Sequence, residues 1–69
     1  MRLSDMAAQY AESARLLTRR IGQLRTVRRR TRDALGRQAL SERIHTLELL
    51  RREVREMESL TAGYYGRGR

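Results

Sequence analysis

The 69-residue sequence has no cysteine, proline, tryptophan or phenylalanine, and only one histidine, His45. Without cysteine it forms neither a disulfide nor a thiolate cluster, and one histidine does not complete a zinc site. We see no glycine-rich phosphate loop and no Ser/His/Asp constellation around His45. We therefore expect no metal, no cofactor, no small-molecule substrate and no enzymatic activity.

Long apolar stretches are also missing. No run approaches the ~20 residues that cross a bilayer. The first ten residues include Asp5 and lack the continuous apolar block of a signal peptide. We therefore expect a protein of the bacterial or host-cell cytosol, with no membrane partner.

Lysine is absent, so arginine carries the whole basic excess, and the net charge is +8. The excess is local, because residues 19–37 hold eight arginines against Asp33, whereas residues 38–66 hold four arginines against five glutamates. We call residues 19–37 the arginine-rich turn. Clustered guanidinium groups attract phosphates and acidic surfaces. The alternative is a solvated charge run that keeps a small helical protein soluble.

The C-terminal residues 64–69 add two tyrosines and two arginines, a combination that suits stacking on single-stranded nucleic acid. The alternative for Tyr64 is that it extends an apolar seam. The candidate residues for binding nucleic acid or another anionic partner are Arg19, Arg20, Arg25, Arg28, Arg29, Arg30, Arg32, Arg37, Tyr65, Arg67 and Arg69. Within them, Arg25, Arg28, Arg29 and Arg32 have the spacing of one helical face.

Apolar residues recur at steps of three and four in two stripes, which predicts two helices and no strands. We expect helices at 5–30 and 34–62, a turn at 31–33 and a basic aromatic tail at 63–69, all in one domain. Ser4 is the expected N-cap of the first helix. Gly22 lies inside that helix, where it marks either a close approach or a weak point.

Two positions compete for the turn. One lies at residues 31–33, with Asp33 or Thr31 capping the second helix, and the other uses Gly36 to end the first helix. With the first turn, the numbers of facing residues sum to about 64. The expected contacts are then Leu24 with Leu40, Ile21 with Ile44, Leu17 with Leu47, Ala14 with Leu50, Tyr10 with Val54, and Ala7 with Met57. A turn at Gly36 places Arg28 against Ile44 and buries an unpaired charge, so we favour 31–33.

The predicted fold is an all-α antiparallel two-helix hairpin of the coiled-coil type. Two helices do not cover every apolar residue, and the residues left beside the seam are Leu16, Val27, Leu49 and Leu60. We expect these four residues to form the interface of a homodimer arranged as a four-helix bundle. The surface of a different partner would cover them equally well.

A set of residues spread over most of the chain carries a resemblance to known proteins: Leu3, Ser4, Tyr10, Thr31, Asp33, Arg43, Ile44, Leu47, Glu56, Met57, Leu60, Thr61, Tyr64, Tyr65, Arg67 and Gly68. In these positions the sequence resembles a group of small uncharacterised helical-hairpin proteins from phage-like and conjugative elements of clostridial genomes. The resemblance implies a helical hairpin from a mobile element and no particular activity. The first helix is richer in arginine than that group leads us to expect.

Three functions fit the sequence. The first is a non-enzymatic binding protein that engages nucleic acid or a nucleoprotein through the arginine-rich turn. The second is a phage or mobile-element inhibitor, such as an anti-CRISPR protein that acts on an RNA-guided nuclease. The third is a structural helical adaptor that docks its apolar stripe on partner helices.

Overall fold

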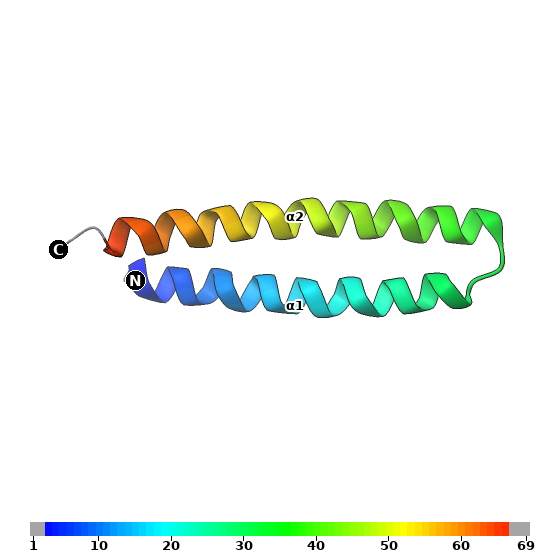
Figure 1. The fold of residues 1–69 in the computed structure, drawn as a ribbon, viewed down its shortest axis with the longest axis horizontal. Coiled ribbons are helices and arrows are strands. Elements are labelled where there is room, and N and C mark those ends of the chain that lie inside the picture. Colours follow the sequence, from blue (N-terminus) through cyan, green and yellow to red (C-terminus); the bar gives the residue numbers. More distant parts are fainter. Residues whose placement is uncertain (1–2, 67–69) are drawn as a thin grey trace.

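In the computed structural model, residues 3–66 are described, with side chains for residues 5–63. The described chain forms two helices, α1 (Leu3–Arg30) and α2 (Ala34–Gly66), and no strand. The helices run antiparallel side by side along their whole length, and the connection lies at one end (Figure 1). The molecule measures 54 × 17 × 14 Å. The predicted all-α hairpin is thereby confirmed.

The turn occupies residues 31–33, and the Asp33 side chain caps α2. The Gly36 backbone N–H donates to Asp33 Oδ2 at 2.6 Å, and the Arg37 N–H donates to the Asp33 carbonyl at 2.9 Å. This is the bonding expected of an N-cap residue, which satisfies amides that the first helical turn leaves unpaired. No described glycine has positive φ, so Gly36 is not a left-handed residue that ends α1. The second candidate turn is therefore wrong.

The outer ends of the two helices extend beyond the expected limits. Helix α1 begins at Leu3, so Ser4 lies inside it and the predicted N-cap is wrong. Helix α2 continues to Gly66, and residues 63–66 are helical although we expected them in the tail. Such terminal turns are the least determined by sequence, since few tertiary contacts fix them.

The core lies nearer the turn than the open end. Ile21, Leu24 and Ile44 are buried together, and Leu40 and Leu47 pack against them. Ile21 is only 1% exposed. These contacts agree with the predicted pairing of Ile21 with Ile44 and of Leu24 with Leu40.

The pairing at the open end differs from the prediction. Leu50 and Met57 were expected to face Ala14 and Ala7, yet they are 45% and 43% exposed. The next residues along α2, Arg51 and Glu58, are half-buried in their place. The physical reason is spacing, because a seam between two paired helices keeps alternating steps of four and three, and Leu47, Arg51, Val54 and Glu58 follow that rhythm. These two predicted contacts are wrong.

Candidate anion-binding interface

The arginine-rich turn extends from near the middle of α1, where Arg19 and Arg20 lie, to the closed end of the hairpin, where α1, the loop and the first turns of α2 meet (Figure 1). Seven of its eight arginines are exposed, and Arg28 is half-buried. Arg28, Arg29 and Arg30 occupy the last turn of α1, where the negative end of the helix dipole favours cations. The fold therefore gathers most of the predicted site residues at one end of the molecule.

Two of the predicted site residues connect the helices to each other. Arg25 forms an ion pair with Glu48 of α2, and Arg28 Nη1 donates to Ser41 Oγ at 3.1 Å. The side chains of Arg25 and Glu48 are 46% and 34% exposed, so water screens their attraction. Spacing along one helix does not show such contacts, because the acceptors belong to the other helix. Arg25 and Arg28 are thus already engaged within the hairpin.

Arg32 is placed differently from the prediction. It was expected to complete a helical face with Arg25, Arg28 and Arg29, but α1 ends at Arg30 and Arg32 lies in the loop. The prediction of one continuous basic helical face is therefore wrong. Arg32 instead lies at the tip of the hairpin.

The remaining arginines of the turn form its outward-facing set. Within the part of the chain that the structure describes, Arg19, Arg30, Arg32 and Arg37 have no side-chain hydrogen bond or ion pair. Arg20 Nη1 donates to Gln23 Oε1 at 3.4 Å, and Arg29 Nη2 donates to Thr26 Oγ1 at 3.3 Å. Neither acceptor is charged, so all six guanidinium groups keep their positive charge without a carboxylate partner. Such groups suit bidentate contacts with phosphate or carboxylate oxygens.

The acidic residue of the turn does little to neutralise this set. Asp33 is exposed, and its Oδ2 accepts the Gly36 amide. Its role is thus structural, and the turn keeps a large positive excess.

Three predicted site residues lie outside the described side chains. Tyr65 falls in the last turn of α2 without a described side chain, and Arg67 and Arg69 lie beyond residue 66. Their proposed contribution to binding stays a prediction. The same holds for the role of Tyr64 in the seam.

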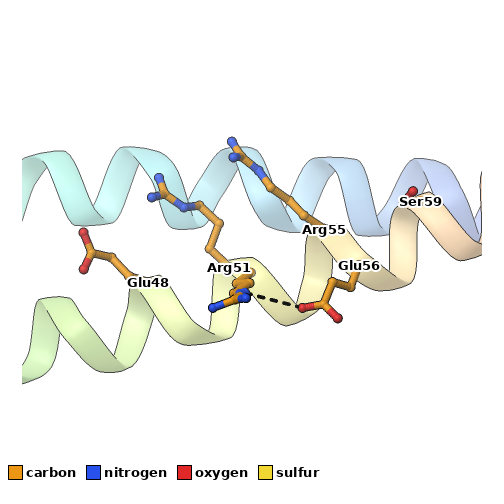
Figure 2. Close-up of a pocket in the computed structure, with 6 residues that line it drawn as sticks. Glu48, Arg51, Arg55, Glu56 and Ser59 are labelled. Atoms are coloured by element: carbon orange, nitrogen blue, oxygen red, sulfur yellow. Dashed lines mark ion pairs between the residues drawn. The ribbon is translucent and has the colours of Figure 1, made fainter.

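A second polar site, which the sequence reasoning missed, lies on α2 towards the open end. A depression of about 540 Å³ is lined by Glu48, Arg51, Arg52, Arg55, Glu56 and Ser59. Figure 2 shows the side chains of Arg51 and Arg55 extending from α2 towards α1. The sequence contains one signal of this site, because the regular seam spacing of α2 places Arg51 at a position that faces α1.

Most of the charges around this depression are paired or bonded. Arg51 Nη1 donates to Thr18 Oγ1 of α1 at 3.2 Å, and the Thr18 hydroxyl donates to the Ala14 carbonyl at 2.9 Å. Arg52 and Glu56 form an ion pair of 3.7 Å. The depression therefore combines both signs of charge, and we regard it as a connection between the helices and not as an anion site.

His45 is exposed, and no group of three metal-ligating side chains occurs among residues whose placement is described. In that same part of the chain, neither helix has a stretch long and apolar enough to cross a membrane.

Several large apolar side chains are exposed in addition to the charged ones. All four residues of the predicted dimer interface, Leu16, Val27, Leu49 and Leu60, are exposed in the single chain. Leu35, Leu50 and Met57 are exposed too. The hairpin thus leaves a large part of its apolar surface in contact with solvent.

Comparison of the chain with protein-family models, curated proteins and solved structures gives no match.

Proposed function

We propose that this protein is a non-enzymatic binding protein that engages nucleic acid, alone or within a nucleoprotein, through the arginine-rich turn. The observation that carries the proposal is the outward-facing set of six arginines, four of them around the closed end, without a carboxylate partner among the described residues. Nucleic acid offers a dense row of phosphates, and neutralising them releases counterions, which favours binding.

The geometry suits phosphate contacts rather than the reading of bases. Arg30, Arg32 and Arg37 lie around one loop, so they meet neighbouring phosphates from a short, exposed tip. Phosphate contacts position a protein without selecting a sequence. We therefore expect binding with little sequence preference and a strong dependence on salt.

The test measures the affinity of the purified protein for labelled single- and double-stranded DNA and RNA over a salt series. The variant combines Arg29→Gln, Arg30→Gln and Arg32→Gln, none of which removes an ion pair or a contact between helices. The matched control removes three arginines elsewhere, namely Arg15→Gln, Arg52→Gln and Arg55→Gln. Both variants have the same net charge. The control also removes the exposed Arg15–Glu12 and Arg52–Glu56 ion pairs, and exposed pairs of this kind contribute little to stability.

We expect the turn variant to lose at least tenfold in affinity, while the control stays close to the original protein. The salt slope of the turn variant should fall by roughly two to three, since each lost phosphate contact on duplex DNA lowers it by about 0.9. Equal losses in both variants contradict a localised site. Affinity that does not change with salt contradicts the proposal as a whole.

A guide-loaded RNA-guided nuclease is one nucleoprotein that this mode of binding fits, in line with the inhibitor hypothesis. Adding the purified protein to such a nuclease tests that form of the proposal. Cleavage that is blocked by the original protein and restored by the turn variant supports it. Unchanged cleavage by several such nucleases contradicts the proposal that the protein inhibits them.

A structural helical adaptor is the second candidate, because seven large apolar side chains are exposed among the residues whose side chains the structure describes. An adaptor would dock these side chains against partner helices and would not use the arginine-rich turn. Binding to such a partner should then survive the three turn substitutions, and its loss with them argues against the adaptor.

A further inference from the structure

The seam between the helices fixes which way every other side chain points. On α1 the buried and half-buried seam residues are Ala7, Tyr10, Ala14, Leu17, Ile21, Leu24 and Arg28. On α2 they are Leu40, Ile44, Leu47, Arg51, Val54, Glu58 and Thr61. Successive residues of an α-helix are rotated by about 100° around the helix axis. A residue directly before a seam position therefore lies on one flank of the seam, and a residue directly after it lies on the opposite flank.

One flank of the hairpin is polar and joins the helices. Thr18 and Arg25 directly follow seam residues of α1, and Glu48 and Ser41 directly follow seam residues of α2. The contacts Arg25 with Glu48, Arg28 with Ser41, and Arg51 with Thr18 all form on this flank. Because these three contacts connect the two helices, the flank of α1 and the flank of α2 that carry them lie on the same side of the hairpin.

The opposite flank carries exposed apolar side chains from both helices. Each of them directly precedes a seam residue, and together they form what we call the apolar face: Leu16, Val27, Leu50, Met57 and Leu60. The exposed charged residues Arg20, Arg43 and Glu53 also directly precede seam residues and lie among them, so Arg20 borders this face as well as belonging to the arginine-rich turn. Val27 lies near the turn, Leu16 and Leu50 near the middle, and Leu60 towards the open end. Leu49 was expected at the same interface, but it lies two residues from both Leu47 and Arg51 and so points away from α1.

We infer that the apolar face binds a second copy of this chain, which makes a four-helix bundle. The outline of this side of the hairpin measures 54 Å by 17 Å, on the order of 900 Å², polar residues included. Each partner of a standard interface buries about 800 Å², so a second copy is a partner of matching size. A twofold axis brings the identical patch of both copies together.

The distribution of charge selects an antiparallel arrangement of the two copies. The half of the hairpin nearer the turn, residues 17–49, has nine arginines and three acidic residues. The open half of the sequence, residues 1–16 and 50–69, has seven arginines and five acidic residues. A parallel dimer places the two strongly basic halves side by side, where like charges repel, whereas an antiparallel dimer places each of them beside a half with much less positive charge. The arginine-rich turns then lie at opposite ends of the bundle.

Two neighbouring leucines allow a matched test by molar mass in solution. Leu50 is 45% exposed on the apolar face, and Leu49 is 46% exposed on the outer side of α2. We expect the original protein and Leu49→Glu to sediment at twice the chain mass of 8.1 kDa, and Leu50→Glu to sediment as a single chain. A folded single-chain mass for the original protein overturns the inference and points to a different partner for this face. Equal effects of both substitutions also overturn it.

If the Leu50→Glu chain does not fold, the dimer is tested instead by diluting the original protein. Helicity, followed by circular dichroism, should then fall as the concentration decreases, because folding and dimerisation are coupled. Constant helicity at a single-chain mass contradicts the dimer.

The orientation is measured separately with a spin label on Ala34→Cys, which is the only cysteine in the labelled protein. Residue 34 lies at the start of α2, so an antiparallel dimer separates the two labels by about 45 Å at ~1.5 Å per residue. A parallel dimer brings them within roughly 25 Å, because packed helix axes are only 8–10 Å apart. A distance near 45 Å supports the antiparallel arrangement, and a short distance overturns it.

Discussion

Replacing Gly22 by alanine is expected to stabilise the hairpin, because this glycine lies in the middle of α1 and serves no packing purpose. It is exposed, and an alanine Cβ at this position would have no atom within 4 Å outside the neighbouring helix turn. Glycine costs about 1 kcal/mol relative to alanine in a helix interior, through its larger backbone entropy when unfolded. In a domain of this size the gain raises the melting temperature by roughly 4–8 °C.

The assay is thermal unfolding followed by circular dichroism at one fixed protein concentration, with Gly36→Ala as the matched comparison. At Gly36 an alanine Cβ lies 3.1 Å from Asp33 Oδ2 and 3.2 Å from Thr31 Cγ2, so the cap of α2 must shift to admit it. We expect Gly36→Ala to be less stable than Gly22→Ala by about 1 kcal/mol or more. A Gly22→Ala protein that melts at or below the original temperature refutes the reasoning, since it would mean that the glycine makes a close contact.

Three further predictions concern the cap, the core and the ion pair between the helices. Asp33→Ala should cost about 1 kcal/mol in urea unfolding and Asp33→Asn much less, because asparagine also accepts the Gly36 amide; equal losses contradict the cap. Ile21→Ala should cost about 2–5 kcal/mol and leave little stability, so that helicity at 37 °C falls sharply; a small loss contradicts its place in the core. A double-mutant cycle on Arg25 and Glu48 should give a coupling of roughly 0.2–1 kcal/mol that weakens in high salt, and a coupling insensitive to salt argues against an exposed ion pair.

Much of the hairpin was predictable because its determinants are local. The end of α1, the three-residue turn and the start of α2 follow from the cap at Asp33 and from the cost of burying Arg28 in the other register. The pairing near the turn was also predictable, since a short loop leaves the first seam residues, such as Leu24 and Leu40, little freedom to shift.

The errors lie where a contact depends on the partner helix. The sequence reasoning assigned Leu50 to the seam because it is apolar, although regular seam spacing selects Arg51, whose guanidinium group reaches Thr18 of α1. Similarly, Arg25 and Arg28 were counted with the outward-facing arginines because their acceptors, Glu48 and Ser41, lie far away in sequence. A long side chain that bridges two helices is not visible in the pattern of either one.

The position of the core near the turn also determines how the hairpin should fold and open. Contacts among Ile21, Leu24 and Ile44 join residues about twenty apart in sequence, whereas contacts at the open end join residues about fifty apart. Closing the shorter loops costs less entropy, so we expect folding to start at the turn and to proceed towards the termini. Amide exchange should accordingly be slowest around Ile21 and fastest at the open end. The exposed arginines around the turn therefore belong to the segment that we expect to form first and to open last, so their mutual arrangement should outlast the opening of the rest of the hairpin.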